Sequence, residues 1–176
     1  MPRVFIAVGS NIHPAENVRK AIEILRGEVR VTAISTFFRT RPLNRPGQPD
    51  FYNGVMEVET DTPPVELKQE ILRSTEEALG RKRDADRNAA RTIDLDIIVY
   101  DDLVVNTEEL TLPDPEIARR PFLAVPLSEL APDMTLPGSG QTSAEVAGRF
   151  AHHNMEPLFE FTETLRKELA DEPREG

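Results

Sequence analysis

Hydrophobic residues in the first part of the chain recur at two spacings, which predict strands and helices in alternation. Residues 3–9 read RVFIAVG, an apolar and β-branched run that is typical of a buried strand and ends at a glycine. Pro14 is well placed to open a helix, because the next apolar residues form an i, i+3, i+4, i+7 stripe: Val18, Ala21, Ile22 and Leu25. Residues 29–40 then predict one long strand, rich in β-branched and aromatic side chains.

A second set of elements completes the same pattern. Residues 51–60 alternate as a strand does, with Phe51 and Asn53 on one face. A helix follows Pro64, and residues 93–100 predict a fourth strand. The order strand, helix, strand, strand, helix, strand predicts an α+β fold: a ferredoxin-like βαββαβ core with a mostly antiparallel sheet and its helices on one face.

Three later segments predict additions to this core in the form of extra C-terminal helices. Residues 115–132 favour short helical turns broken by proline. Residues 142–150 predict a short helix opened by Thr142 or Ser143, which are good N-cap residues. Residues 155–169 predict a terminal amphipathic helix.

Length, composition and charge limit the class of protein. The chain has 176 residues, of which 39% are hydrophobic and 30% charged, as in ordinary globular proteins. We expect a single domain over residues 1–176, with a core over about 3–137 and a helical extension over about 142–170. A formal net charge of −10 argues against a general nucleic-acid binder, which needs an extensive basic surface. Small molecules are therefore the expected partners.

Several absences bear on the compartment. The chain has no cysteine, and its N-terminal residues do not resemble a secretory signal. No apolar run approaches the roughly 20 residues that a membrane-spanning helix needs. We expect a cytoplasmic protein without a membrane association, and the pattern assigns it no protein partner.

Two aspartates stand one residue apart in the last predicted core strand, within ARTIDLDIIVYDD over residues 90–102. Asp94 and Asp96 share one face of that strand. The other face is expected to carry apolar side chains: Ile93, Leu95, Ile97 and Val99. Two carboxylates held this close repel each other and lose hydration, a cost that a divalent cation or arginine side chains can offset.

A basic segment precedes this strand in an otherwise acidic chain. It reads GRKRDADRNAAR over residues 80–91 and contains Arg81, Lys82, Arg83, Arg87 and Arg91. Carboxylates that hold Mg²⁺ beside guanidinium groups that bind phosphate oxygens would suit a metal-bound polyphosphate. A structural interpretation fits the pattern equally well, in which the aspartates pair with Arg81 or Arg91 and the basic loop is solvated. The pattern alone leaves both open.

Glycine-rich phosphate loops are missing from the chain. There is no GxxxxGK[ST], and GSN at residues 9–11 is not a GxGxxG. Side chains would therefore have to hold any phosphates. Arg119 and Arg120, followed by Phe122, are further candidates.

Four segments together resemble the 6-hydroxymethyl-7,8-dihydropterin pyrophosphokinase family: GSN at 9–11, RPLNRPGQPDFYN at 41–53, RTIDLDIIVYDD at 91–102 and LTLPDPEIARRPFLAVPLSELAPD at 110–133. The resemblance covers about residues 3–137. It implies an α+β fold with a ferredoxin-like core. It also implies Mg²⁺-dependent transfer of pyrophosphate from ATP to the hydroxymethyl group of the pterin, with release of AMP, in folate biosynthesis.

The resemblance further implies roles for particular residues. Asp94 and Asp96 match the family's aspartates that bind two Mg²⁺ ions, and with Arg81 and Arg91 they are the candidate catalytic residues. The implied ATP contacts are Glu76, Arg81, Arg83, Arg91, Ile97, Asp114 and Arg120. The implied pterin contacts are Thr40, Leu43, Phe51, Asn53 and Phe122. Loops 41–50 and 81–91 are natural lids, whose closure would bring their arginines to the phosphates.

Each of these residues also has an ordinary interpretation. Phenylalanine is usually a core residue, Thr40 is unremarkable at a strand end, and Glu76 lies in a charged helical stretch where solvation is common. In favour of a pterin pocket, two aromatic faces can sandwich a flat heterocycle, and an asparagine amide can donate and accept along its edge.

Three features depart from the family pattern. Asp114 stands where the family has a histidine, which places an anion near ATP. Residues 88–90 read NAA where the family often has Trp-Gly-Pro, so a lid aromatic is absent, and the chain beyond Pro137 is longer than in compact members. Two alternatives therefore stay open. One is a catalytically weakened homologue that binds pterin or nucleotide in a regulatory or scaffolding role, and the other is a two-metal phosphodiesterase or nuclease.

Overall fold

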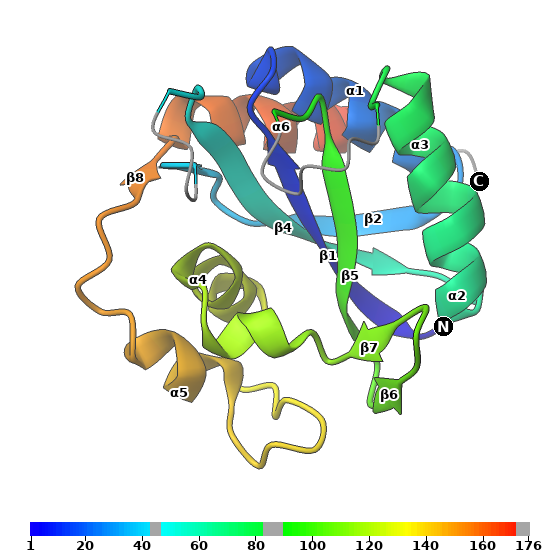
Figure 1. Cartoon of the computed structure of the whole chain (residues 1–176), viewed down its shortest axis with the longest axis vertical. Helices are drawn as coiled ribbons and strands as arrows, with labels where there is room; N and C mark the ends of the chain where they lie inside the picture. Colours follow the sequence, from blue (N-terminus) through cyan, green and yellow to red (C-terminus); the bar gives the residue numbers. More distant parts are fainter. Residues whose placement is uncertain (43–46, 83–89, 172–176) are drawn as a thin grey trace.

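One antiparallel sheet forms the centre of the molecule (Figure 1). The computed structural model describes residues 1–42, 47–82 and 90–171. The strands of the sheet are β1 (Arg3–Ser10), β2 (Arg30–Ile34), β3 (Phe38–Thr40), β4 (Phe51–Glu59), β5 (Asp94–Tyr100) and β8 (Glu156–Pro157). They lie in the order β5-β1-β4-β3-β8, with β2 also paired to β4, and each of these pairings is antiparallel. The predicted α+β fold class is confirmed.

Helices cover both faces of this sheet. They are α1 (Pro14–Arg26), a continuous helical stretch of α2 (Pro64–Glu66), the π-helical η1 (Leu67–Leu72) and α3 (Arg73–Ala78), then η2 (Pro115–Ala118), α4 (Pro121–Leu130), α5 (Ser143–Gly148) and α6 (Phe159–Asp171). A small hairpin of β6 (Val105–Asn106) and β7 (Thr111–Leu112) stands apart from the sheet. No described helix is long and apolar enough to cross a membrane.

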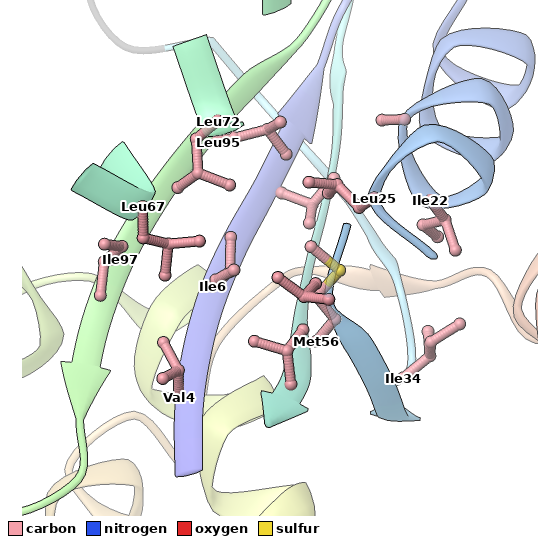
Figure 2. Close-up of a cluster of buried hydrophobic side chains, with 14 of the residues drawn as sticks. Val4, Ile6, Ile22, Leu25, Ile34, Met56, Leu67, Leu72, Leu95 and Ile97 are labelled. Carbon is pink, nitrogen blue, oxygen red and sulfur yellow. The ribbon is translucent and has the colours of Figure 1, made fainter. Parts of the chain in front are cut away.

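Two hydrophobic cores explain this arrangement, because the central strands bury side chains on both faces. Val4 and Ile6 of β1 point toward α1, η1 and α6 together with Met56 of β4 (Figure 2). Phe5 of β1 points the other way and packs against η2, α4 and α5. The core helices therefore lie on one face, as predicted, and the C-terminal additions α4 and α5 cover the opposite face.

The predicted strand over residues 29–40 is two strands, β2 and β3. The chain leaves the sheet between them at Ser35, whose N–H donates to the Val55 carbonyl at 2.9 Å and whose hydroxyl accepts from the Val55 N–H at 2.9 Å. A side-chain oxygen thus replaces a backbone carbonyl as the acceptor for one hydrogen bond of the sheet. The strand is interrupted there, although the run of apolar residues in the sequence continues.

A β-bulge in β5 changes which face of the sheet its last residues point to. Phe5 lies opposite Val99 and Ile6 opposite Ile97, so Ile98 is an extra residue in β5. Val99 therefore packs with Phe5 in the second core, and the prediction that Val99 shares a face with Ile97 is wrong.

Proline does not break the segment that follows η2. Helix α4 runs through Pro126, so the prediction of helical turns broken by proline over residues 115–132 is wrong for this part of the segment. One backbone hydrogen bond is lost there, and burial of Leu123, Ala124 and Leu127 against the sheet offsets it.

Candidate active site

A cavity of about 870 Å³ lies on the α4 side of the sheet, a volume usual for small-molecule sites. Its walls come from the ends of β1, β4 and β5 and from the η2–α4 region. They include these predicted site residues: Phe51, Asn53, Arg81, Arg91, Asp94, Asp96, Asp114, Arg120 and Phe122. Segments far apart in the sequence thus bring the expected phosphate and pterin contacts to one place.

Other predicted site residues do not line the cavity. Thr40 and Glu76 lie behind it and contact residues that do. The side chain of Ile97 is 5% exposed and belongs to the core on the other face of the sheet, away from the cavity. Leu43 and Arg83 lie outside the described residues, as do parts of both predicted lids.

The two aspartates share the cavity face of β5, where Asp94 lies opposite Gly9 and Asp96 opposite Ala7. Arg81 Nη1 donates to Asp94 Oδ1 at 3.1 Å, and Arg91 Nη1 donates to Asp94 Oδ2 at 2.6 Å. The side chain of Asp96 has no hydrogen bond or ion pair with any described residue. The interpretation in which the aspartates pair with arginines therefore holds for Asp94. The oxygens of Asp96, by contrast, stay available to a ligand.

Glu76 anchors Arg81 from behind the cavity. Its side chain is buried at the end of α3, pairs with Arg81 Nη1, and accepts from the Leu95 N–H at 3.3 Å. Burial lowers the pKa of Arg81, but Asp94 and Glu76 outweigh it, so the pKa lies above its ordinary value. The alternative that Glu76 is a solvated helix residue is wrong.

Asp96 titrates far from its ordinary range. Loss of hydration is the largest cause, followed by repulsion from Asp94 and Glu76, and together they raise the pKa of Asp96 to about 8. Water reaches the side chain through the cavity mouth, although protein atoms make up most of its surroundings. A cation beside Asp96 would offset this repulsion.

The donor set suits Mg²⁺ rather than a closed metal site. Within residues 1–42, 47–82 and 90–171, no three His, Cys, Asp or Glu side chains cluster as metal ligands. Mg²⁺ typically takes one or two carboxylates and completes its coordination with water and substrate phosphates. Asp94 and Asp96 fit that role.

Asp114 serves as a helix cap at the edge of the cavity. Its Oδ1 accepts from the Glu116 N–H at 2.9 Å and so begins η2. Burial is the main cause that raises the pKa of Asp114. Glu116 in turn pairs with Arg120, whose Nε donates to Glu116 Oε2 at 2.9 Å.

A second group of cavity residues, called the neutral end below, carries no charge. Phe51 and Phe122 line the cavity there together with Asn53, whose Nδ2 donates to Thr40 Oγ1 at 2.7 Å. Gly9 allows this arrangement, because a Cβ there would lie 2.6 Å from Asn53 Oδ1.

Asn11 is a functional candidate that the sequence interpretation missed. This buried residue accepts from the Arg91 N–H at 2.7 Å and donates to Gln48 Oε1 at 3.2 Å and to the Pro49 carbonyl at 3.3 Å. It therefore ties together the ends of both predicted lids. The GSN motif was a signal, but a polar residue after a strand is also an ordinary turn residue.

An α+β fold whose cavity combines a carboxylate pair, arginines and aromatic side chains fits an enzyme that acts on a metal-bound polyphosphate and a flat acceptor. A family model described as 7,8-dihydro-6-hydroxymethylpterin-pyrophosphokinase matches residues 5–132. The chain therefore belongs to the 7,8-dihydro-6-hydroxymethylpterin-pyrophosphokinase family, which confirms the resemblance drawn from its motifs.

Relatives by sequence agree with this assignment, and a solved structure shares the fold. The 2-amino-4-hydroxy-6-hydroxymethyldihydropteridine pyrophosphokinase of Haemophilus influenzae is 36% identical over 158 residues, which cover 88% of this chain and 97% of that protein. The Synechocystis protein of the same name is 38% identical over 140 residues, covering 78% and 70%. A Plasmodium falciparum HPPK-DHPS crystal structure with pteroate shares the fold at a TM-score of 0.69 and 12% identity, covering 85% of this chain and 42% of that one. The chain thus spans less than half the length of that solved protein.

Proposed function

We propose that this chain transfers pyrophosphate from ATP to the hydroxymethyl group of 6-hydroxymethyl-7,8-dihydropterin in folate biosynthesis, and that the described cavity is the active site. The observation that carries the proposal is the joining, in one cavity, of the Asp94–Asp96 pair with the neutral end at Phe51, Asn53 and Phe122. ATP is the co-substrate, as the family implies. A cytoplasmic location suits a cysteine-free chain that uses ATP.

The neutral end is assigned to the pterin. Phe51 and Phe122 offer apolar ring faces to a flat heterocycle, while Asn53 can donate and accept along its polar edge. Thr40 holds the Asn53 amide in place from behind. Leu43 is kept as a further proposed pterin contact.

The charged end is assigned to the triphosphate. Arg81, Arg91 and Arg120 each have a carboxylate partner in this structure, and we propose that they exchange it for phosphate oxygens when ATP binds. Arg83 is proposed to assist them, and Glu76 keeps Arg81 at the cavity wall. The exchange leaves Asp94 free to act with Asp96.

Asp94 and Asp96 are the proposed ligands of two Mg²⁺ ions, which when bound would neutralise phosphate charge. Around them the protein acts by positioning and by electrostatics. The pterin hydroxymethyl oxygen forms a bond to the β-phosphorus, the bond between that phosphorus and the oxygen of the α-phosphate breaks, AMP leaves, and the hydroxyl proton is released. Arg81 and Arg91 stabilise the charge that develops on the phosphate oxygens.

The test is product formation by the whole chain. With ATP, Mg²⁺ and 6-hydroxymethyl-7,8-dihydropterin, we expect AMP and the pterin diphosphate in equal amounts, separated by ion exchange. The double variant Asp94→Ala/Asp96→Ala is expected to form neither, whereas Asp133→Ala, an exposed aspartate, is the matched control. No AMP from a wild-type chain that still binds either substrate would overturn the proposal in favour of a weakened homologue. Cleavage of single-stranded DNA would favour a nuclease.

A further inference from the structure

The backbone between β2 and β3 is held by groups from the C-terminal half of the chain. The Thr36 N–H donates to Glu129 Oε2 at 2.9 Å, and the Phe37 N–H donates to Thr162 Oγ1 at 2.9 Å. The Phe37 carbonyl accepts from the Leu158 N–H at 2.8 Å. Because buried backbone groups must be paired, these contacts replace the sheet ladder where the chain leaves β4.

A single guanidinium completes this attachment. Arg166 of α6 donates from Nε and Nη2 to the Ile34 carbonyl at 3.1 and 3.0 Å, and from Nη2 to Glu129 Oε1 at 3.0 Å. Strand β8 then pairs with β3, with Pro157 opposite Phe38. The segment over residues 156–166 thus holds residues 34–39 on their outer side, from the end of β2 into β3.

The fixed strand, β3, pairs with β4, the strand that carries Phe51 and Asn53 of the neutral end. Its register places Phe38 opposite Asn53 and Thr40 opposite Phe51. The Phe37 ring lies directly against β4, because a Cβ on Gly54 would lie 2.6 Å from the ring. Movement of Phe37 would therefore displace the strand on which Asn53 and Phe51 stand.

Aromatic packing transmits the same constraint from α6. Phe161 packs edge-to-face on Phe37, with ring centroids 5.6 Å apart, and on Tyr52 at 5.3 Å. Tyr52 lies between Phe51 and Asn53 in β4, with its side chain on the opposite face of the strand. Helix α6 thus supports the sheet from behind the cavity.

We infer that Thr162 and Arg166 are positioning residues for the pterin, which act through Phe37 and β3 on Asn53 and Phe51. The inference rests on the proposed function, since it assigns the neutral end to the acceptor. In the charged end, Asp94 and Asp96 stand on β5 and Arg81 follows α3, and neither element takes part in these contacts, whereas Arg120 caps α4, the helix that carries Glu129. Loss of the attachment should therefore affect the pterin and spare ATP.

The first test exchanges the hydroxyl of Thr162. Thr162→Val keeps the side-chain shape and removes the acceptor, and we expect the KM for the pterin to rise about tenfold while the KM for ATP stays within about twofold. Thr162→Ser keeps the hydroxyl and is expected to restore the wild-type KM for the pterin. A general loss of packing would not be rescued in this way.

The second test compares two arginines, Arg166, which is half-buried, and Arg19, which is exposed. Arg166→Ala is expected to raise the KM for the pterin about fivefold. Arg19→Ala is the matched control, because Arg19 contacts the same helix through Glu168 at 2.7 Å but lies on α1. It should leave both KM values unchanged. An unchanged KM for the pterin in Thr162→Val and Arg166→Ala, or equal rises for both substrates, would overturn the inference.

Direct binding separates this inference from the proposed function. Pterin affinity is measured by fluorescence titration on the chain saturated with Mg²⁺ and a non-hydrolysable ATP analogue. A wild-type chain that binds pterin but forms no AMP would overturn the proposed reaction, and weaker pterin binding by Thr162→Val would still support the inference. A wild-type chain that binds no pterin would overturn both.

Discussion

The two ends of the cavity are prepared for their ligands in different ways. In the charged end, Arg81 and Arg91 already bind Asp94, and Arg120 binds Glu116. In the neutral end, the Asn53 amide donates a hydrogen bond to Thr40, and the ring faces of Phe51 and Phe122 have no charge to satisfy. A ligand must therefore exchange ion pairs at one end, whereas at the other it only has to fill a shaped space.

This difference determines how each end should respond to mutation. Removing one member of a charged network leaves another charge unpaired, so the effects extend to its neighbours. Removing a neutral contact affects the ligand group that it touched and little else. The predictions below would sharpen this contrast or break it.

The largest effect is expected at Asp96, the carboxylate without a partner among the described residues. Asp96→Ala should reduce kcat at least about 1000-fold, because one carboxylate is too few for the proposed pair of cations. Acceptor-dependent AMP formation at saturating substrates measures it, with Asp133→Ala alongside. Activity near the wild-type level in Asp96→Ala would remove the metal assignment.

A smaller and more selective effect is expected at Asn53. Asn53→Ala should lower kcat/KM for the pterin about 100-fold, because the polar edge of the ring loses its partner, while the KM for ATP changes little. Steady-state kinetics with each substrate varied in turn would show this. A comparable loss for ATP would mean that Asn53 does not belong to a separate acceptor end.

The negative charge of Asp114 can be removed without removing the helix cap that its side chain provides. Asp114→Asn removes the anion and keeps a good N-cap for η2, so stability should be retained. We expect ATP to bind roughly fivefold more tightly, and Asp114→His to change affinity in the same direction. Equilibrium titration with ATP and Mg²⁺ measures it. Unchanged or weaker binding in both variants would show that the phosphates lie away from Asp114.

The smallest effect concerns stability in protein freed of divalent ions with EDTA. The pKa of Asp96 is raised from 3.8 to about 8, so the folded state holds this proton more tightly than the unfolded state does. Its contribution to stability is therefore lost as the pH rises from about 4 to about 8 and is constant above. Asp96→Asn avoids this loss.

Thermal unfolding is measured across that pH range. The stability of Asp96→Asn relative to the wild-type chain should increase as the pH rises. The gain should level off above about pH 8 at roughly 1 kcal/mol, or about 3 °C, because water in the cavity screens the charges. Parallel pH profiles for the two proteins would contradict the assigned pKa shift.

Local patterns were enough for much of the fold. The spacing of Val18, Ala21, Ile22 and Leu25 located α1, and these four residues are its buried face. The alternation along β5 placed Asp94 and Asp96 on one side. Both results depend on neighbours within a few residues, which the sequence displays directly.

Features that depend on distant contacts were out of reach. The bulge at Ile98 appears only when β5 pairs with β1, and the break after β2 depends on Ser35 meeting Val55. Strand β8 forms because residues more than a hundred positions earlier offer an edge.

The same limit applied to the charges of the site. The sequence left open whether the aspartates meet arginines, since the loop that carries Arg81 and Arg91 could place them at many distances. The structure pairs both with Asp94 and neither with Asp96, so two residues with the same pattern differ in their surroundings.

The most direct test of the two-ended cavity compares Arg120 with Phe122, which stand two positions apart and both line it. The KM values for ATP and for the pterin are measured for Arg120→Ala and Phe122→Ala under the same conditions. The account predicts that Arg120→Ala raises the KM for ATP alone, and that Phe122→Ala raises the KM for the pterin alone. If both variants raised the KM of the same substrate, the division of the cavity into a phosphate end and a pterin end would be wrong.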